Sequence, residues 1–141
     1  MATDVTFHPL DAVENGHIRF ACIIARHQGR WVYCKHRERD TWENPGGRRE
    51  PGEDAMQTAH RELCEETGAE AYSLTPVCLY DVRRDGSEAS YGLLCRADIT
   101  AFGTLGAFEI ERIALFDDIP EPLTYPDIQP KLLKRAWEGE A

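Results

Sequence analysis

The chain has 141 residues, of which 25 are acidic and 16 basic, so its formal net charge is −9 with histidine neutral. A chain of this length predicts a single domain, residues 1–141, that can bury its own core. The acidic balance argues against a protein that coats a nucleic-acid polymer, since such proteins need a positively charged face. It does not exclude phosphate chemistry, because bound divalent metal ions can reverse the local charge.

The cysteines and the chain's amino terminus bear on its compartment. The five cysteines stand singly, and none forms a pair at zinc-binding spacing. The first ten residues lack the basic and then apolar pattern of a signal peptide, and no apolar run is long enough to span a membrane. We therefore expect a soluble, cytoplasmic protein with reduced thiols and no membrane partner.

The first elements in chain order are two predicted strands. Residues 17–25 and 31–36 are rich in β-branched and apolar residues, and the short turn between them predicts an antiparallel hairpin. Residues 37–52 are polar and contain two glycine turns, at 45–47 and 51–52.

A helix is predicted over residues 54–67. Asp54, with Gln57 three residues later, is typical of a capping box at a helix start. Gly68 is the residue type that most often follows a helix end.

The rest of the chain predicts more strands and one further helix. Strands are expected at 73–82, 91–99 and 111–116, with a turn at 83–86, and a terminal helix should cover 127–137. The hairpin favours antiparallel pairing, while one longer crossover could bring strands parallel. The predicted class is α+β, with a mixed β-sheet sandwiched between helices (α/β/α).

Three glutamates of the central helix share one face. Glu62, Glu65 and Glu66 stand at i, i+3 and i+4, so their carboxylates fall within an arc of roughly 100°. Like charges at this spacing destabilise a helix by about 0.2–0.5 kcal/mol per pair, and the carboxyl-terminal turns already disfavour anions. Arg61 is the only arginine or lysine in this helix. Conflicts of this kind with local rules are expected at functional sites.

A divalent cation would resolve this conflict. Mg²⁺ and Mn²⁺ prefer hard oxygen ligands and usually take a few carboxylates together with waters and substrate phosphates. The glycine turn just upstream can add backbone groups at close approach. The alternative is a solvated acidic helix face, which is common in a chain of this charge. The cluster alone leaves both interpretations open.

A longer pattern surrounds the cluster. Gly47 is followed after five residues by Glu53, and after seven more by Arg61-Glu62-Leu63-x-Glu65-Glu66-x-Gly68-Ala69. This pattern, over residues 47–69, resembles the Nudix box of the Nudix (MutT-type) hydrolases, with Ala69 where the family usually has a bulkier aliphatic residue. The preceding segment 42–47, WENPGG, is similar to the family's entry into the box, with Asn44 at a position that is more often apolar.

The resemblance implies the Nudix fold and a particular chemistry. Nudix hydrolases cleave a pyrophosphate bond in a nucleoside diphosphate joined to another group, and they use Mg²⁺ or Mn²⁺. On this resemblance Glu62 would bind metal or act as the base that activates water. Glu65 and Glu66 would bind metal, and the carbonyl of Gly46 would add a further ligand.

Other box positions would have structural roles. Glu53 and Arg61 would form an ion pair that holds the helix against the loop and orients the metal-binding carboxylates. Gly47 and Gly68 belong to the same structural set, one at each end of the box.

Members of the family often add a carboxylate from late in the chain. Glu109 and Glu111 are the candidates here, and we favour Glu109, which lies further from the predicted strand. Glu109 therefore joins Glu62 and Glu65 as a catalytic candidate. The alternative is an exposed loop glutamate with no role in the chemistry.

Basic residues flank the box on its amino-terminal side. Arg37, Arg48 and Arg49 are candidates for binding phosphate, because the arginine fork suits phosphate oxygens. The alternative for each is a solvated, charge-balancing loop residue.

The expected substrate is a small nucleotide. Signatures that mark family members cleaving ADP-ribose, diadenosine polyphosphates, coenzyme A or NADH are missing downstream of the box and at its entry. Their absence favours a (d)NTP pyrophosphatase, with oxidised nucleotides such as 8-oxo-dGTP among its candidate substrates. The alternatives are an ADP-ribose or other nucleotide-sugar pyrophosphatase and a non-catalytic nucleotide-binding module. The resemblance also allows a homodimer.

Overall fold

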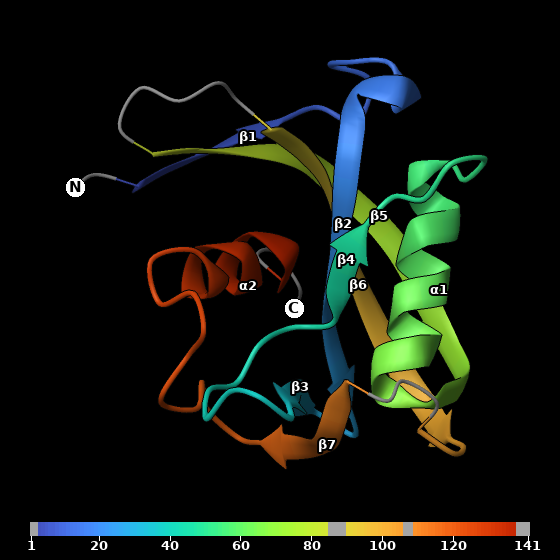
Figure 1. Ribbon diagram of the computed structural model, residues 1–141, viewed down its shortest axis with the longest axis vertical. Coiled ribbons are helices and arrows are strands. Elements are labelled where there is room, and N and C mark those ends of the chain that lie inside the picture. The colour runs from blue at the N-terminus through green and yellow to red at the C-terminus, as the bar shows by residue number, and fades with distance from the viewer. Residues whose placement is uncertain (1–2, 85–89, 106–108, 138–141) are drawn as a thin grey trace.

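A mixed seven-stranded sheet forms the centre of the protein (Figure 1). The computed structural model describes residues 3–84, 90–105 and 109–137. Its elements in chain order are β1 (Thr3–His8), a short 3₁₀ helix η1 (Asn15–His17), β2 (Ile18–His27), β3 (Arg30–His36), β4 (Gly46–Arg48), α1 (Ala55–Thr67), β5 (Ala69–Arg84), β6 (Ser90–Phe102), β7 (Ile110–Phe116) and α2 (Gln129–Trp137).

The strands follow the order β1-β5-β6-β2-β3-β7, and β4 pairs with β2 beside this path. Strands β2 and β6 are parallel, and the other paired strands of the described sheet are antiparallel. The predicted hairpin is β2–β3, and the crossover through β4, α1 and β5 brings β6 parallel to β2. This arrangement confirms the predicted mixed sheet.

The side chains of β2 alternate between two hydrophobic cores. Ile23 packs in the core that contains Leu63 of α1, whereas Ile24 packs in the core that contains Leu132 of α2. Successive side chains of a strand point to opposite faces, so the two helices cover opposite faces of the sheet (Figure 1). The α/β/α layering is therefore confirmed.

The sequence reading missed two strands. It assigned no element to β1, which pairs with β5 over residues 3–8. It placed a turn at residues 45–47, but Gly46–Arg48 forms β4 on β2. A Cβ on Gly46 would collide with the carbonyl oxygen of Ala21, so the glycine lets the two backbones approach. Propensity could not indicate this pairing, because it depends on a distant strand.

Several predicted boundaries were also wrong. Strands β5 and β6 extend beyond their predicted ends, since their long mutual pairing carries them further. Arg83 and Arg84 close β5 instead of opening a turn, and residues 85–86 lie outside the described residues. Helix α2 begins at Gln129, two residues later than expected, and Pro130 lies in its first turn.

Both ends of α1 have the predicted caps. Asp54 accepts a hydrogen bond from the Gln57 backbone N–H at 2.8 Å, and the Gln57 side chain accepts one from the Asp54 N–H at 2.8 Å. Gly68 follows the helix with φ 76°, in the left-handed region, and its N–H donates to the carbonyl of Cys64. The caps fix the first and last turns of the helix that carries the acidic cluster.

All five cysteines are free thiols. Of the two α-helices that the structure describes, neither is long and apolar enough to cross a membrane. The cytoplasmic location stays a prediction.

We expect Gly68→Ala to destabilise the protein more than Gly52→Ala. Both glycines have positive φ, 76° and 86°, but a Cβ at Gly68 would lie 3.1 Å from the Gly103 carbonyl oxygen whereas Gly52 faces open space. We expect a loss of about 2–3 kcal/mol for Gly68→Ala and about 1 kcal/mol for Gly52→Ala. Urea unfolding measures both, and equal losses would contradict the role given to the close contact.

Candidate active site

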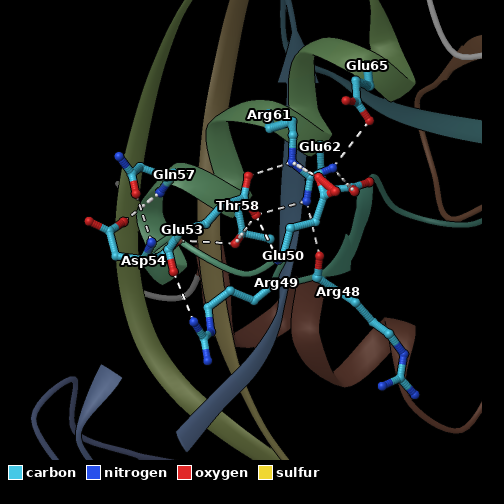
Figure 2. A network of polar contacts seen from close by, with 10 residues as sticks. All are labelled: Arg48, Arg49, Glu50, Glu53, Asp54, Gln57, Thr58, Arg61, Glu62 and Glu65. Carbon is cyan, nitrogen blue, oxygen red and sulfur yellow. Dashed lines mark hydrogen bonds and ion pairs between the residues drawn. The ribbon is translucent and has the colours of Figure 1, made fainter. Parts of the chain in front are cut away.

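Arg61 is the centre of an ion-pair network on α1 (Figure 2). Its guanidinium contacts Glu53 through Nε at 2.6 Å and Nη2 at 3.0 Å. Nη1 contacts Glu62 at 2.7 Å and Glu65 at 3.4 Å, and Nε also lies 3.1 Å from Glu50. A single cation thus holds four carboxylates and offsets the like-charge repulsion along the helix face.

Glu53 is fixed as an anion. Its carboxylate accepts hydrogen bonds from Arg61, from the Glu50 backbone N–H and from the Thr58 hydroxyl, and together these lower the pKa of Glu53 to about 2. The Glu53–Arg61 pair, with a further bond from Arg61 Nη2 to the Arg48 carbonyl at 3.1 Å, ties the loop before α1 to the helix.

Glu62 lies against β4. A Cβ on Gly47 would stand 2.6–2.7 Å from the atoms of the Glu62 carboxylate, so only glycine leaves room for this group. Burial raises the pKa of Glu62, the Arg61 guanidinium opposes this, and the charges of Glu65 and Glu109 raise it further. Glu65 itself is exposed and contacts Arg61.

Glu66 is the most buried carboxylate of the helix face, at 6% exposure. Its Oε1 accepts a hydrogen bond from the Gly46 N–H at 2.8 Å. Burial raises the pKa of Glu66 to about 8; the Gly46 bond opposes the shift, and the charges of Glu62, Glu43 and Glu109 add to it. A positive charge next to Glu66, in addition to that of Arg61, would therefore strongly favour the ionised carboxylate.

Two further residues, His36 and Glu43, extend this cluster. His36 Nε2 lies 2.8 Å from Glu43 Oε1 and 3.9 Å from Glu66 Oε2. Glu43 Oε2 is 3.0 Å from Arg39 Nη1, and its backbone pairs with Cys34 of β3. The sequence analysis did not assign either residue to the site. Glu43 directly precedes the glycine turn, which was the one available signal, whereas His36 arrives only through the pairing of β3.

The structure separates the two late glutamates. The backbone carbonyl of Glu109 accepts from the Arg37 N–H at 2.9 Å, which places Glu109 beside the end of β3. Its charge acts on both Glu62 and Glu66. Glu111 instead pairs with Lys35 at 3.2 Å. This geometry supports Glu109 as the candidate from outside the box.

The three candidate arginines have different surroundings. Arg49 donates to backbone carbonyls of Ile18 at 2.9 Å, Glu53 at 3.0 Å and Gly16 at 3.3 Å, so its guanidinium holds loops together. These bonds already occupy its guanidinium, and the phosphate-binding role of Arg49 stays a prediction. Arg48 is exposed, and its side chain points away from the Arg61 network in Figure 2. Arg37 is exposed near Glu109.

The donor chemistry fits a divalent cation. Glu62, Glu66 and Glu109 supply hard carboxylate oxygens, and burial, together with their mutual repulsion, raises the pKa values of the first two. Among the described residues no three His, Cys, Asp or Glu side chains already converge as a metal site. Arg61 holds the Glu62 and Glu65 carboxylates, and the Gly46 N–H holds that of Glu66. Metal binding would therefore have to compete with these contacts.

A cavity of about 880 Å³ lies on the sheet face that α2 covers; we call it the α2-face cavity. Gly46 and Gly47 line it, and the same two residues contact the carboxylates of α1. Its wall also includes aromatic, polar and basic side chains, among them Phe20, Tyr80, Tyr125, Asn44, Gln129 and Arg48. A single short strand thus separates an acidic cluster from a ligand-sized cavity.

The chain belongs to the NUDIX family, since the family model for the NUDIX domain matches residues 16–134. This match confirms the family that the box motif implies.

A bacterial relative matches part of the chain. Over 60 residues the chain is 43% identical to a Bacillus subtilis (strain 168) protein named "Putative 8-oxo-dGTP diphosphatase YtkD". The aligned segment covers 43% of this chain and 37% of that protein. The chain thus spans little more than a third of this relative's length.

Solved structures share the fold. The Bacillus subtilis pyrophosphohydrolase BsRppH matches with a TM-score of 0.71 and 29% identity, over 84% of this chain and 73% of that one. A UDP-X diphosphatase matches with a TM-score of 0.69 and 19% identity, over 88% and 64%. A MutT NUDIX hydrolase from Burkholderia pseudomallei matches with a TM-score of 0.60 and 23% identity, over 83% and 96%. The last two matches show the fold alone.

We expect Glu66→Gln to stabilise the metal-free protein at alkaline pH. The pKa of Glu66 rises from 4.5 to about 8 on folding, so the folded state holds the proton more tightly and stability falls as pH rises through this window. The amide has no charge and can still accept from Gly46. The stability advantage of Glu66→Gln should grow to on the order of a few kcal/mol between pH 5 and pH 8.5.

Urea unfolding in EDTA measures this difference. The matched control is Glu65→Gln, which removes the same charge from an exposed position and should show no such growth. An advantage for Glu66→Gln that is constant with pH would contradict the burial argument.

Proposed function

We propose that this protein is a divalent-metal-dependent pyrophosphohydrolase that cleaves a pyrophosphate bond in a nucleoside diphosphate-linked substrate. One observation carries the proposal: Gly46 and Gly47 form a shared wall between the acidic cluster of α1 and the α2-face cavity. A nucleotide whose nucleoside occupies the cavity would place its phosphates along this wall, beside Glu62 and Glu66.

The side chains then have distinct roles. Glu62, Glu65 and Glu66, with the Gly46 carbonyl, would hold Mg²⁺ or Mn²⁺, which supplies charge neutralisation at the phosphate oxygens. Glu109 or Glu62 would accept the proton of the attacking water. Arg61 is a positioning residue, because it holds Glu62 and Glu65 through Nη1.

Arg48 supports phosphate binding on the cavity side. It is exposed on β4 opposite Phe20, lines the α2-face cavity, and points away from the Arg61 network. A guanidinium there can contact phosphate oxygens without displacing an internal ion pair. Arg37, next to Glu109 on the other side, is the second candidate.

Within this class we propose a (d)NTP pyrophosphatase, releasing a nucleoside monophosphate and pyrophosphate, with 8-oxo-dGTP as the first substrate to test. The name of the Bacillus subtilis relative YtkD supports this choice. We further propose that residues 1–141 act as one cytoplasmic domain; a homodimer is compatible with this function.

Activity should require the metal and Glu62. With Mg²⁺ or Mn²⁺ the full chain should release pyrophosphate from 8-oxo-dGTP, and excess EDTA should abolish this release. Glu62→Gln should lower kcat about 100-fold or more with a smaller change in KM, because it removes a group that acts on the reacting centre. Asp4→Asn, an exposed change on β1, is the control and should retain wild-type rates. Full activity in Glu62→Gln would contradict its assigned role.

A substrate panel separates the alternatives. It should contain the four common dNTPs, 8-oxo-dGTP, ADP-ribose, a UDP-sugar and a dinucleoside polyphosphate, with products resolved by ion-exchange chromatography. Preferred turnover of ADP-ribose or the UDP-sugar would favour a nucleotide-sugar pyrophosphatase. No turnover of any compound with either metal would overturn the enzymatic proposal and favour a binding module.

A further inference from the structure

Asn44 is an unusual residue of the α2-face cavity. It occupies the box entry at a position that is more often apolar in the family it resembles, and it lies one residue before Pro45-Gly46. The residue lines the cavity and is only 8% exposed. Its Oδ1 is buried and has no hydrogen-bond partner among the described residues.

Such an acceptor carries an energetic cost. A buried polar group without a partner destabilises the protein relative to a paired one. A ligand that brings a donor to Asn44 Oδ1 through the cavity would remove this cost.

Tyr33 is a neighbour of Asn44. Burial raises the pKa of the Tyr33 hydroxyl to about 12, and a hydrogen bond with the Asn44 side chain opposes the shift. Because Asn44 Oδ1 has no partner among the described residues, this oxygen is the atom of the amide that can accept a hydrogen bond from a ligand.

The other polar side chains on this part of the wall are already paired. Gln129 Oε1 accepts from the Tyr125 N–H at 2.8 Å, and its Nε2 donates to the Trp42 carbonyl at 3.2 Å. The two oxygens of Glu43 lie at 2.8 Å from His36 and 3.0 Å from Arg39. Asn44 Oδ1 is therefore the buried wall atom with bonding capacity to spare in this part of the described chain.

The rest of the cavity suits a flat, aromatic ligand group. Phe20 and Tyr80 line it and pack edge to face with ring centroids 5.5 Å apart. Stacking of a base on an aromatic ring favours binding, and a purine offers more stacking surface than a pyrimidine. The volume of about 880 Å³ is sufficient for a purine nucleotide.

We propose that Asn44 is a specificity-determining residue whose Oδ1 accepts a hydrogen bond from the exocyclic amino group of a purine held in the α2-face cavity. The inference rests on the proposed function in that the phosphates of such a nucleotide would lie along Gly46 and Gly47. A purine that carries a carbonyl in place of the amino group would leave Oδ1 unpaired and bind less tightly.

Binding of nucleoside monophosphates tests this assignment. They contain no pyrophosphate bond, so the measurement does not depend on turnover. Isothermal titration of the full chain in Mg²⁺ would compare GMP and AMP, which carry an amino group, with IMP, which lacks one. We expect GMP or AMP to bind about tenfold more tightly than IMP.

Two variants connect the preference to the amide. Asn44→Leu removes the acceptor at similar volume and should reduce the preference below about threefold. Tyr33→Phe removes the hydroxyl that bonds the Asn44 side chain and should also weaken the preference, while stacking on Phe20 is retained. Circular dichroism and urea unfolding establish that each variant is folded.

The outcomes are decisive. Equal binding of all three nucleotides by the wild-type protein, or no binding, would overturn the proposal. A preference that persists unchanged in folded Asn44→Leu would also overturn it. The stated preference in a protein that hydrolyses nothing would support the role of Asn44 and refute the proposed enzymatic function, so the two failures are distinguishable.

Discussion

The structure of the site depends on the guanidinium of Arg61. Its contacts with Glu50, Glu53, Glu62 and Glu65 connect the loop before α1 with the face of the helix that carries the acidic cluster. Without a cation at this point the like charges on the helix face would repel one another. The neutralisation is local and incomplete, because Glu66 lies outside this network and its pKa is raised to about 8.

Strand β4 gives this chemistry its position. Its two glycines permit close approach on both sides: Gly46 to the backbone of β2 and Gly47 to the Glu62 carboxylate. Strand β4 therefore separates the acidic cluster from the α2-face cavity. The net charge of −9 is compatible with phosphate substrates, because part of the acidic charge lies in the cluster on α1 where a divalent cation would be bound.

Much of the fold was predictable because its signals are local. The capping box at Asp54, the left-handed Gly68 and the apolar pattern of β2 depend on neighbouring residues, and the helix and the strand formed within two residues of their predicted bounds. Strand β1 and the glycine strand β4 were missed because their stability comes from pairing with distant strands. The roles of Glu62, Glu65 and Glu66 stay predictions that the geometry supports.

The sequence by itself determined the family, the central helix and the face on which its glutamates stand, since helical periodicity and fixed spacing are properties of a continuous segment. Only the tertiary structure decided which residues from other segments join them. It brought His36 and Glu43 to Glu66, assigned Arg49 to backbone carbonyls, and left Asn44 Oδ1 unpaired in the cavity wall. These contacts join residues far apart in the chain, so they follow from strand order and packing, which no local pattern specifies.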